Sequence, residues 1–273
     1  MDERFAGATG RIFPGVTKPL IAMAHLAALP GTPGYDTGRG IGGIIDGLRR
    51  DVDVLCDVGF DAILFCNESD RPYELKAGLA SAAVMARIVT ECIPLDVPFG
   101  TDFLWDEQCG LAVAVATGAA FMRGVVAGVW ESDMGLWQPD GAALQRERRR
   151  LGADDLAIFA NVTPEFASSM GRRPADAVAR SVAISGLPDA ILVSGAMAGN
   201  EPELGTLAAI RDAVPPDIPV FLNTGAKATT IGGYLQHADG CIVGSDLKAG
   251  GYTWNPVDRD RAKRFFESAR AAS

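Results

Sequence analysis

The sequence predicts an α/β protein, a single (β/α)8 TIM barrel, and three observations carry this prediction. Eight short apolar runs alternate with eight amphipathic segments along the chain. Strict alternation of this kind requires a parallel sheet, and eight repeats in 273 residues close most naturally into a barrel. No linker divides the sequence, so residues 1–273 are expected to form one barrel domain, with residues 1–17 as an N-terminal extension.

Each expected strand is a short apolar run that breaks into small or polar residues. The strands are expected at residues 20–24, 62–65, 97–101, 121–126, 156–162, 190–193, 220–222 and 241–243. The first helical pattern contains Ile44, Ile45, Leu48, Val52 and Leu55, and the others cover residues 74–90, 108–117, 141–151, 174–185, 203–214, 229–238 and 257–272. An open doubly wound sheet is the alternative. It is disfavoured because no GxGxxG motif follows the first strand, and the sequence therefore shows no nicotinamide or flavin motif.

The amino-acid composition limits which partners the protein can bind and which cellular compartment it occupies. The formal net charge of −9 opposes binding to duplex nucleic acid, which normally needs a basic surface. The longest weakly apolar stretch, residues 111–122, is too short for a membrane span, and the N-terminus lacks the apolar core of a secretion signal. The five cysteines form no CxxC pair and are expected to be reduced thiols. We therefore expect a cytoplasmic protein with a small-molecule substrate, no nucleic-acid partner and no membrane span.

The last two expected strands end in small residues that suit a phosphate group. In barrels of this class the loops after strands seven and eight frequently direct backbone N–H groups at a phosphate. Two of the five lysines of the chain fall in the same loops. The predicted phosphate contacts are Asn223, Thr224, Gly225, Lys227, Gly244, Ser245 and Lys248.

Polar side chains follow nearly every expected strand, at the positions that form the catalytic face of a barrel. His25 follows the first strand, where it suits a general acid or base near neutral pH, or else a hydrogen bond to the loop of residues 29–35. The catalytic candidates are His25, Glu68, Asp102, Arg123 and Asp133. The further substrate-binding candidates are Asn67, Asn161, Ser194 and Gly195, and Glu165 is another polar residue after the fifth strand.

The acidic members of this ring also allow a divalent cation. Mg²⁺ prefers one or two carboxylates together with substrate oxygens, which makes Mg²⁺ the candidate cofactor and Asp102 and Asp133 its candidate ligands. Solvated acidic loops are the plainer interpretation in a chain of this charge. No lysine follows the sixth strand, so an imine-forming aldolase would have to use Lys227 or Lys248.

Tryptophans in the loops have two interpretations. Trp130, Leu136, Trp137 and Trp254 could be exposed anchors for a neighbouring subunit, which favours a homo-oligomer. Trp105 and Trp137 could instead form aromatic walls of the ligand pocket.

A resemblance to a known family extends over nearly the whole chain. It rests on residues 23–33 (MAHLAALPGTP), 67–73 (NESDRPY), 121–123 (FMR), 132–135 (SDMG), 194–195 (SG), 242–248 (IVGSDLK) and 255–258 (NPVD). In this combination and order the sequence resembles the BtpA family. The resemblance implies a phosphate-binding type of (β/α)8 barrel, in a family named for a role in photosystem I biogenesis and with relatives associated with sugar or nucleoside utilisation.

The chain also departs from the pattern of the family it resembles. Similar sequences usually carry an Asn where this chain has Asp102, an Arg–Asn pair near Trp105 and Asp106, and a Lys–His pair within residues 163–166. The usual Arg-x-Asn after the fourth strand is Arg123-Gly124-Val125 here. Fewer basic groups imply a less anionic substrate or a site that recruits a cation.

Two functions from different classes follow. The first is an enzyme, a lyase, isomerase or hydrolase, that acts on a small phosphorylated sugar or nucleoside-like metabolite with His25 as acid or base. The second is a non-catalytic assembly or regulatory factor of the BtpA type that keeps the barrel and its pocket.

Overall fold

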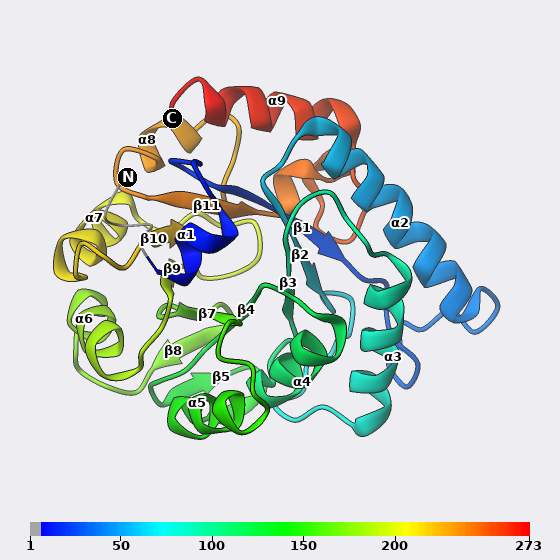
Figure 1. The fold of residues 1–273 in the computed structure, drawn as a ribbon, viewed down its shortest axis with the longest axis horizontal. Coiled ribbons are helices and arrows are strands. Elements are labelled where there is room, and N and C mark those ends of the chain that lie inside the picture. The colour runs from blue at the N-terminus through cyan, green and yellow to red at the C-terminus, as the bar shows by residue number, and fades with distance from the viewer. Residues whose placement is uncertain (1–6) are drawn as a thin grey trace.

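A computed structural model describes residues 7–273, and within them eight parallel strands form a closed barrel (Figure 1). The barrel strands are β1 (Leu20–His25), β2 (Ala62–Cys66), β3 (Phe99–Asp102), β4 (Phe121–Gly124), β7 (Ala157–Asn161), β9 (Ala190–Val193), β10 (Val220–Leu222) and β11 (Gly240–Val243). Pairing of Leu20 in β1 with Cys241 in β11 closes the ring. The predicted (β/α)8 barrel is confirmed, and the strand ends differ from the expected ones by a few residues.

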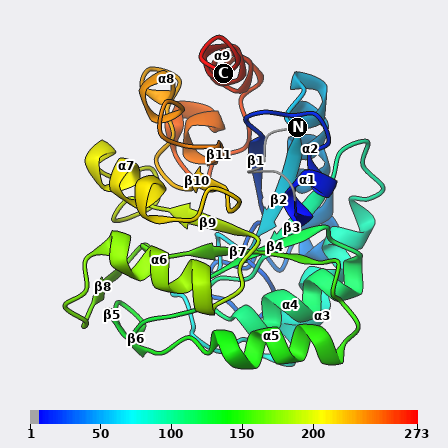
Figure 2. The ribbon, with the colours of Figure 1, turned by 60° about the vertical axis from the view of Figure 1, so that its left-hand side comes forward.

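Helices surround the barrel and cover the outer faces of its strands (Figures 1 and 2). They are α2 (Gly40–Val58), α3 (Leu79–Glu91), α4 (Glu107–Thr117), α5 (Gly141–Arg150), α6 (Ala175–Ser185), α7 (Leu204–Ala213), α8 (Ile231–Tyr234) and α9 (Arg259–Arg270). The predicted helix at 229–238 is too long, because Gly232 and Gly233 weaken it. The helix expected from residue 74 begins only at Leu79, after the extended residue Gly78.

The core has two parts because every barrel strand is buried on both faces. One apolar cluster lies between the strands and the helices, and the other fills the barrel interior. The interior contains Phe121, Phe159 and Phe221, whose neighbouring rings stack at centroid distances of 4.8 and 5.6 Å. Large rings here leave little open space along the barrel axis, so a ligand site must lie at an end of the barrel.

The N-terminal segment covers the end of the barrel at which the strands begin. A short helix, α1 (Ala8–Ile12), lies over the barrel in Figure 1, and the adjoining Phe13 is buried against Phe121 at the start of β4. Of the predicted extension at 1–17, residues 1–6 lie outside the described residues. This arrangement leaves the carboxyl ends of the strands as the functional end.

A small antiparallel sheet, which the sequence did not predict, lies in the loops after β4 and β7. It consists of β5 (Trp130–Ser132), β6 (Gly135–Trp137) and β8 (Ala167–Ser169). Strands of three residues are too short to show a clear alternation. The sheet buries Trp130 and Trp137, so the interpretation of these two residues as exposed subunit anchors is wrong, whereas Leu136 stays 59% exposed.

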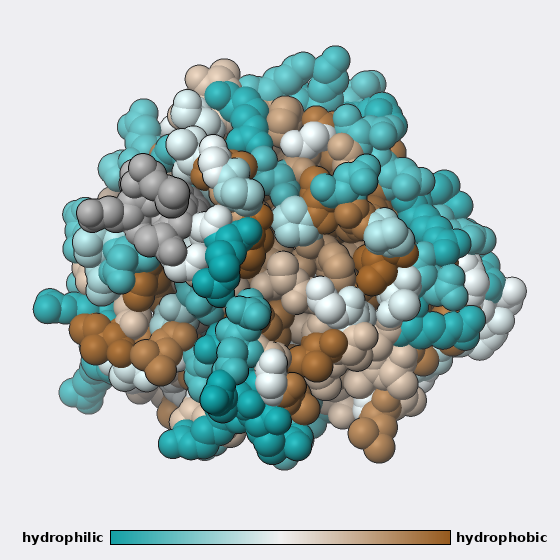
Figure 3. Space-filling model, viewed as in Figure 1, coloured by the Kyte–Doolittle hydropathy of each residue, from teal (hydrophilic) through white to brown (hydrophobic). Residues whose placement is uncertain are grey.

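Most helices around the barrel are amphipathic, with polar side chains on the outer surface and apolar side chains toward the core. In Figure 3 the rim formed by α9 and α2 is hydrophilic, and Arg259, Asp260 and Lys263 of α9 are exposed there. The inner face of α9 contributes Phe265 to the core. Among residues 7–273, no helix has both the length and the apolar character that crossing a membrane requires.

Candidate active site

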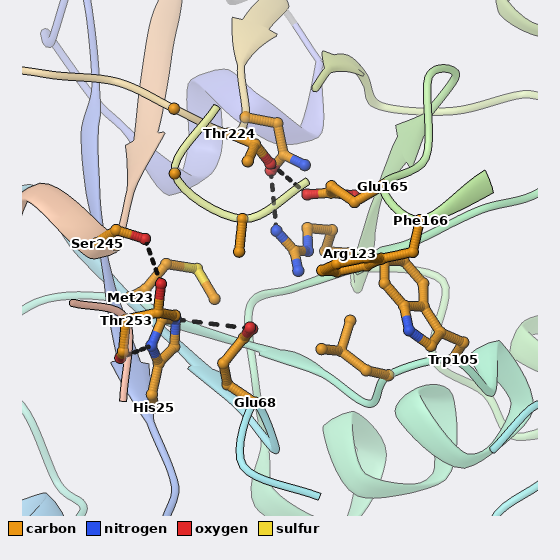
Figure 4. Close-up of a pocket in the computed structure, with 16 residues that line it drawn as sticks. Met23, His25, Glu68, Trp105, Arg123, Glu165, Phe166, Thr224, Ser245 and Thr253 are labelled. Atoms are coloured by element: carbon orange, nitrogen blue, oxygen red, sulfur yellow. Dashed lines mark hydrogen bonds and ion pairs between the residues drawn. The ribbon is translucent and has the colours of Figure 1, made fainter. Parts of the chain in front are cut away.

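The carboxyl ends of the barrel strands surround a small pocket (Figure 4). In this view His25 and Thr253 lie on one side, Trp105 and Phe166 lie on the other, and Glu68 and Arg123 lie between them. The pocket is lined by Met23, His25, Glu68, Leu104, Trp105, Arg123, Glu165, Phe166, Ala198, Gly199, Asn223, Thr224, Gly225, Gly244, Ser245 and Thr253.

His25, the last residue of β1, is held as a neutral imidazole. Its Nδ1 lies 3.2 Å from the backbone oxygen of Thr253, so Nδ1 carries the proton and donates it to that oxygen. Burial and the charge of Lys248 hold the pKa of His25 well below its usual value. Gly244 gives the ring room, because a Cβ there would lie 3.1 Å from His25 Cε1. The lone pair on Nε2 is therefore available to accept a proton.

Glu68, which follows β2, lies opposite the free nitrogen of His25. Its Oε2 is 4.0 Å from His25 Nε2. The Tyr73 hydroxyl lies within hydrogen-bond distance of Glu68 Oε1, at 3.2 Å, and the Trp254 indole N–H donates to the Glu68 backbone oxygen at 3.1 Å. Burial raises the pKa of the Glu68 carboxyl to about 7, although nearby Arg123 opposes the rise. A neutral base and a carboxyl group whose pKa is raised to about 7 thus face each other.

Arg123 in β4 is the guanidinium that lines the pocket, and a polar network fixes it. Its Nε donates to Asp102 Oδ2 at 2.6 Å, and its Nη1 donates to Asn223 Oδ1 at 3.2 Å. Burial alone would lower the pKa of Arg123, but the carboxylates of Asp102 and Glu165 outweigh burial and raise it. Arg123 therefore stays charged and fixed in orientation.

Further amides and hydroxyls extend this network to neighbouring strands. Asn223 Nδ2 and Asn161 Nδ2 both donate to Ser194 Oγ, at 2.8 and 3.0 Å. Asn161 also donates to Glu165 Oε2 at 3.1 Å, and the Thr224 hydroxyl donates to the other oxygen of Glu165. The ends of β7, β9 and β10 are thereby joined into one rigid polar floor.

The loops after β10 and β11 line the pocket with Thr224, Gly225, Gly244 and Ser245. Gly225 has a φ of +85°, and a Cβ there would overlap the backbone of Asn200, so glycine is required on both counts. The N–H groups of Thr224, Gly225 and Gly244 have no acceptor within the described residues. The Ser245 hydroxyl is 2.7 Å from that of Thr253. These N–H and hydroxyl groups can donate hydrogen bonds to an anionic ligand.

The structure brings together eight of the predicted site residues and places others behind them. Asp102, Asn161 and Ser194 act in the network described above. Gly195 lies against the backbone of Asn200, where a Cβ would overlap. The predicted residues that line the pocket are His25, Glu68, Arg123, Asn223, Thr224, Gly225, Gly244 and Ser245.

Four predicted residues lie outside the pocket lining, and the contacts or position of each explain why. Lys248 is fully buried, with its Nζ 3.1 Å from Asp51 Oδ2. Lys227 lies outside the pocket lining, with its Nζ 3.0 Å from Glu201 Oε2. Neither lysine lines the pocket, so the expected phosphate contacts and the imine route lack a lysine there.

Asn67 and Asp133 are the other two predicted residues outside the pocket lining. Asn67 is buried and joins two loops, accepting from the Leu104 N–H at 2.7 Å and donating to Asp70 at 2.9 Å. Asp133 is exposed in the turn between β5 and β6. Asp102 is engaged by Arg123, and within the described part of the chain no group of three or more His, Cys, Asp or Glu side chains could hold a metal ion.

Several pocket residues were not predicted as site residues. Thr253 lies in a glycine-rich loop eight residues after Ser245, and its polar character after the last strand was the available signal. Phe166, Met23 and the Ala198–Gly199 turn offered none, because apolar and small residues are as common in cores and turns as in sites. Trp105 was expected as an aromatic wall, and it lines the pocket.

Comparison with known proteins identifies relatives over the same length. The BtpA family profile matches residues 16–271. The chain is 36% identical to the putative sgc region protein SgcQ of Escherichia coli K12, over 93% of this chain and 94% of SgcQ. It is 32% identical to the photosystem I biogenesis protein BtpA of a Synechocystis species, over 92% of this chain and 87% of that protein.

Solved structures support the fold at low sequence identity. Thiamine phosphate pyrophosphorylase from Pyrococcus furiosus aligns with a TM-score of 0.56 at 14% identity, covering 94% of this chain and 96% of that one. N-(5'-phosphoribosyl)anthranilate isomerase from the same organism aligns with a TM-score of 0.56 at 11% identity, covering 93% and 99%. These structures share the barrel. Because the family profile and both sequence relatives extend over nearly the whole chain, the chain belongs to the BtpA family.

Proposed function

We propose that the protein is an enzyme that transfers a proton on a small phosphorylated sugar or nucleoside-like metabolite, in an isomerase, lyase or hydrolase reaction. The observation that carries the proposal is the pair formed by His25 and Glu68, whose facing atoms are 4.0 Å apart beside the pocket. A neutral imidazole and a carboxyl group with a pKa of about 7 supply a base and an acid at the same pH.

In the proposed step, His25 Nε2 takes a proton from a C–H or O–H group of the substrate. Protonated Glu68 gives its proton to a substrate oxygen, so the substrate carries no added negative charge once the step is complete. Arg123, fixed by Asp102 and Asn223, stabilises negative charge that develops on that oxygen. Thr253 keeps the His25 tautomer correct, since its backbone oxygen accepts the Nδ1 proton.

The phosphate of the substrate is assigned to the loops after β10 and β11. Supporting this assignment, the N–H groups of Thr224, Gly225 and Gly244 have no acceptor within the described residues, and these loops line the pocket. Backbone N–H groups bind phosphate without a lysine. The absence of Lys227 and Lys248 from the pocket lining is therefore compatible with a phosphate site.

A thermal-shift panel tests the proposal. Free sugars, sugar phosphates, nucleosides, nucleotides and inorganic phosphate are each added with and without Mg²⁺, because a ligand at about 100 times its dissociation constant stabilises a protein by roughly 2.7 kcal/mol. A selective shift by one phosphorylated class supports the proposal and names the compounds to assay for turnover. A flat panel, with no shift by inorganic phosphate either, contradicts it and favours the non-catalytic alternative, which the name of the Synechocystis relative, photosystem I biogenesis protein BtpA, suggests.

Turnover of the identified compound is then compared in two histidine variants. His25→Gln should keep ligand binding and lose activity. His237→Gln is the matched control, because His237 lies outside the pocket lining and should leave both properties unchanged. Full turnover by His25→Gln contradicts the assigned role of His25.

A further inference from the structure

Trp105 carries an unusual group at the edge of the pocket. It lies just after β3, is 5% exposed, and lines the pocket opposite His25 (Figure 4). Within residues 7–273, its Nε1 is the one buried side-chain nitrogen or oxygen without a hydrogen-bond partner. Leaving a buried donor unpaired is unfavourable, so such a group in a native pocket calls for a ligand acceptor.

Phe166 continues the same wall and is held in a strained conformation. Its ring centroid lies 6.5 Å from that of Trp105 at an interplanar angle of 75°. Its φ of +57° is rare for a bulky residue, and two backbone bonds fix it: its N–H donates to Ala196 at 3.0 Å and its oxygen accepts from Asp133 at 3.2 Å. Strain of this kind concentrates at ligand sites.

Further aromatic rings support the wall from behind. Tyr73 meets Trp105 edge to face at 6.2 Å, and Trp137 meets it at 5.3 Å. Trp137 belongs to the small sheet, which therefore braces the pocket. A wall braced on two sides keeps its shape when a ligand enters.

Polar side chains lie across the pocket from this wall. His25 and Thr253 are on the opposite side and Glu68 lies between them and the wall (Figure 4), and their ring nitrogen, hydroxyl and carboxyl groups can exchange hydrogen bonds with hydroxyl groups. A ligand that fills the space must therefore present hydroxyl groups on one side and a C–H face on the other. It must also offer an acceptor to the Trp105 indole.

We propose that Trp105 is a substrate-binding residue: the C–H face of a sugar phosphate packs on the wall of Trp105 and Phe166, and the indole N–H donates to a sugar oxygen. The proposal rests on the proposed function, and it narrows the substrate class to polyhydroxylated sugars rather than nucleosides. The aromatic wall supplies apolar contact, and the single indole donor fixes the orientation of the sugar.

The test compares two Trp→Phe variants. Trp105→Phe keeps an aromatic ring and removes the unpaired N–H. Trp130→Phe is the matched control, because the buried Trp130 indole donates to the Ala127 backbone oxygen at 3.0 Å and lies outside the pocket lining. Melting temperatures are measured without ligand, and calorimetry measures the binding of ribose 5-phosphate, glucose 6-phosphate, both free sugars, AMP and inorganic phosphate.

We expect Trp105→Phe to weaken binding of the preferred sugar phosphate about tenfold, equivalent to ~1.4 kcal/mol, and to leave inorganic phosphate binding unchanged. Trp130→Phe should bind the sugar phosphate like the wild type but lose more melting temperature than Trp105→Phe, because it breaks an existing hydrogen bond.

Several outcomes overturn the assignment of Trp105. They are equal sugar binding by Trp105→Phe and the wild type, a larger loss of melting temperature in Trp105→Phe than in Trp130→Phe, tighter wild-type binding of AMP than of any sugar phosphate, and no sugar binding at all. If Trp105→Phe weakens sugar binding while His25→Gln keeps full turnover, the wall assignment stands and the catalytic proposal fails.

Discussion

The replacement of Glu68 by glutamine should make the protein more stable at alkaline pH, by an amount that the structure allows us to work out. Burial raises the pKa of this carboxyl from 4.5 to about 7 in the folded protein. At about 1.36 kcal/mol for each pKa unit, that interval corresponds to ~3 kcal/mol. Glutamine has nearly the same shape, can still accept the Tyr73 hydrogen bond and cannot ionise.

The sign follows from which state holds the proton. Between pH 4.5 and about 7 the folded protein keeps Glu68 protonated while the unfolded chain releases the proton. The contribution of Glu68 to the free energy of unfolding therefore falls as pH rises through this window. The advantage of Glu68→Gln over the wild type should be small near pH 5 and should grow by up to ~3 kcal/mol above pH 7.

Urea denaturation of both proteins, from about pH 5 to pH 8, measures this difference directly. Glu107, whose pKa burial raises to about 8, is present in both proteins, so its contribution cancels in the difference. A difference that stays constant with pH, within about 0.5 kcal/mol, would refute the reasoning, because Glu68 would then titrate alike in both states.

Three further predictions concern the base, the buried lysine and the phosphate loop. His25→Gln should lower kcat/KM on an identified substrate by about 10²–10⁴-fold. In the wild-type protein kcat/KM should fall above about pH 7, because the Glu68 carboxyl then ionises and can no longer act as the acid. A flat pH–rate profile contradicts the pairing of His25 with Glu68. Lys248→Met should lower the free energy of unfolding by about 3–5 kcal/mol in urea denaturation, because it leaves the Asp51 carboxylate without its cationic partner. At low temperature, where the variant stays folded, its binding of inorganic phosphate should equal that of the wild type. A variant as stable as the wild type contradicts this prediction. Gly225→Ala should lower the melting temperature and abolish phosphate binding in calorimetry, because the added methyl group would overlap the backbone of Asn200 and residue 225 has a positive φ. Normal phosphate affinity would contradict the assignment of the loop after β10 to the phosphate.

The fold could be predicted because its signals are local. Most barrel strands are apolar runs buried on both faces, and most helices carry their own periodicity, so the alternation is visible without any tertiary contact. The small sheet of β5, β6 and β8 could not be predicted, because strands of three residues carry no clear pattern and β5 pairs with β8 across α5 and β7.

The site was predictable only as a ring of strand ends. The sequence alone places His25, Glu68 and Arg123 at one end of the barrel, because each lies at the end of a parallel strand or just after it. The same rule also selected Lys248 and Asp133, since it gives the end of the barrel on which a residue lies but not the direction of its side chain.

The sequence by itself determined the barrel, its functional end and the loops that surround the pocket, because these follow from patterns within each repeat. Only the tertiary structure decided which polar side chains enter the pocket and in what state of charge. Thr253 meets His25 and Asp51 meets Lys248 across more than 190 residues of chain. Burial, which raises the pKa of Glu68 and lowers that of His25, exists only once the barrel has closed around them.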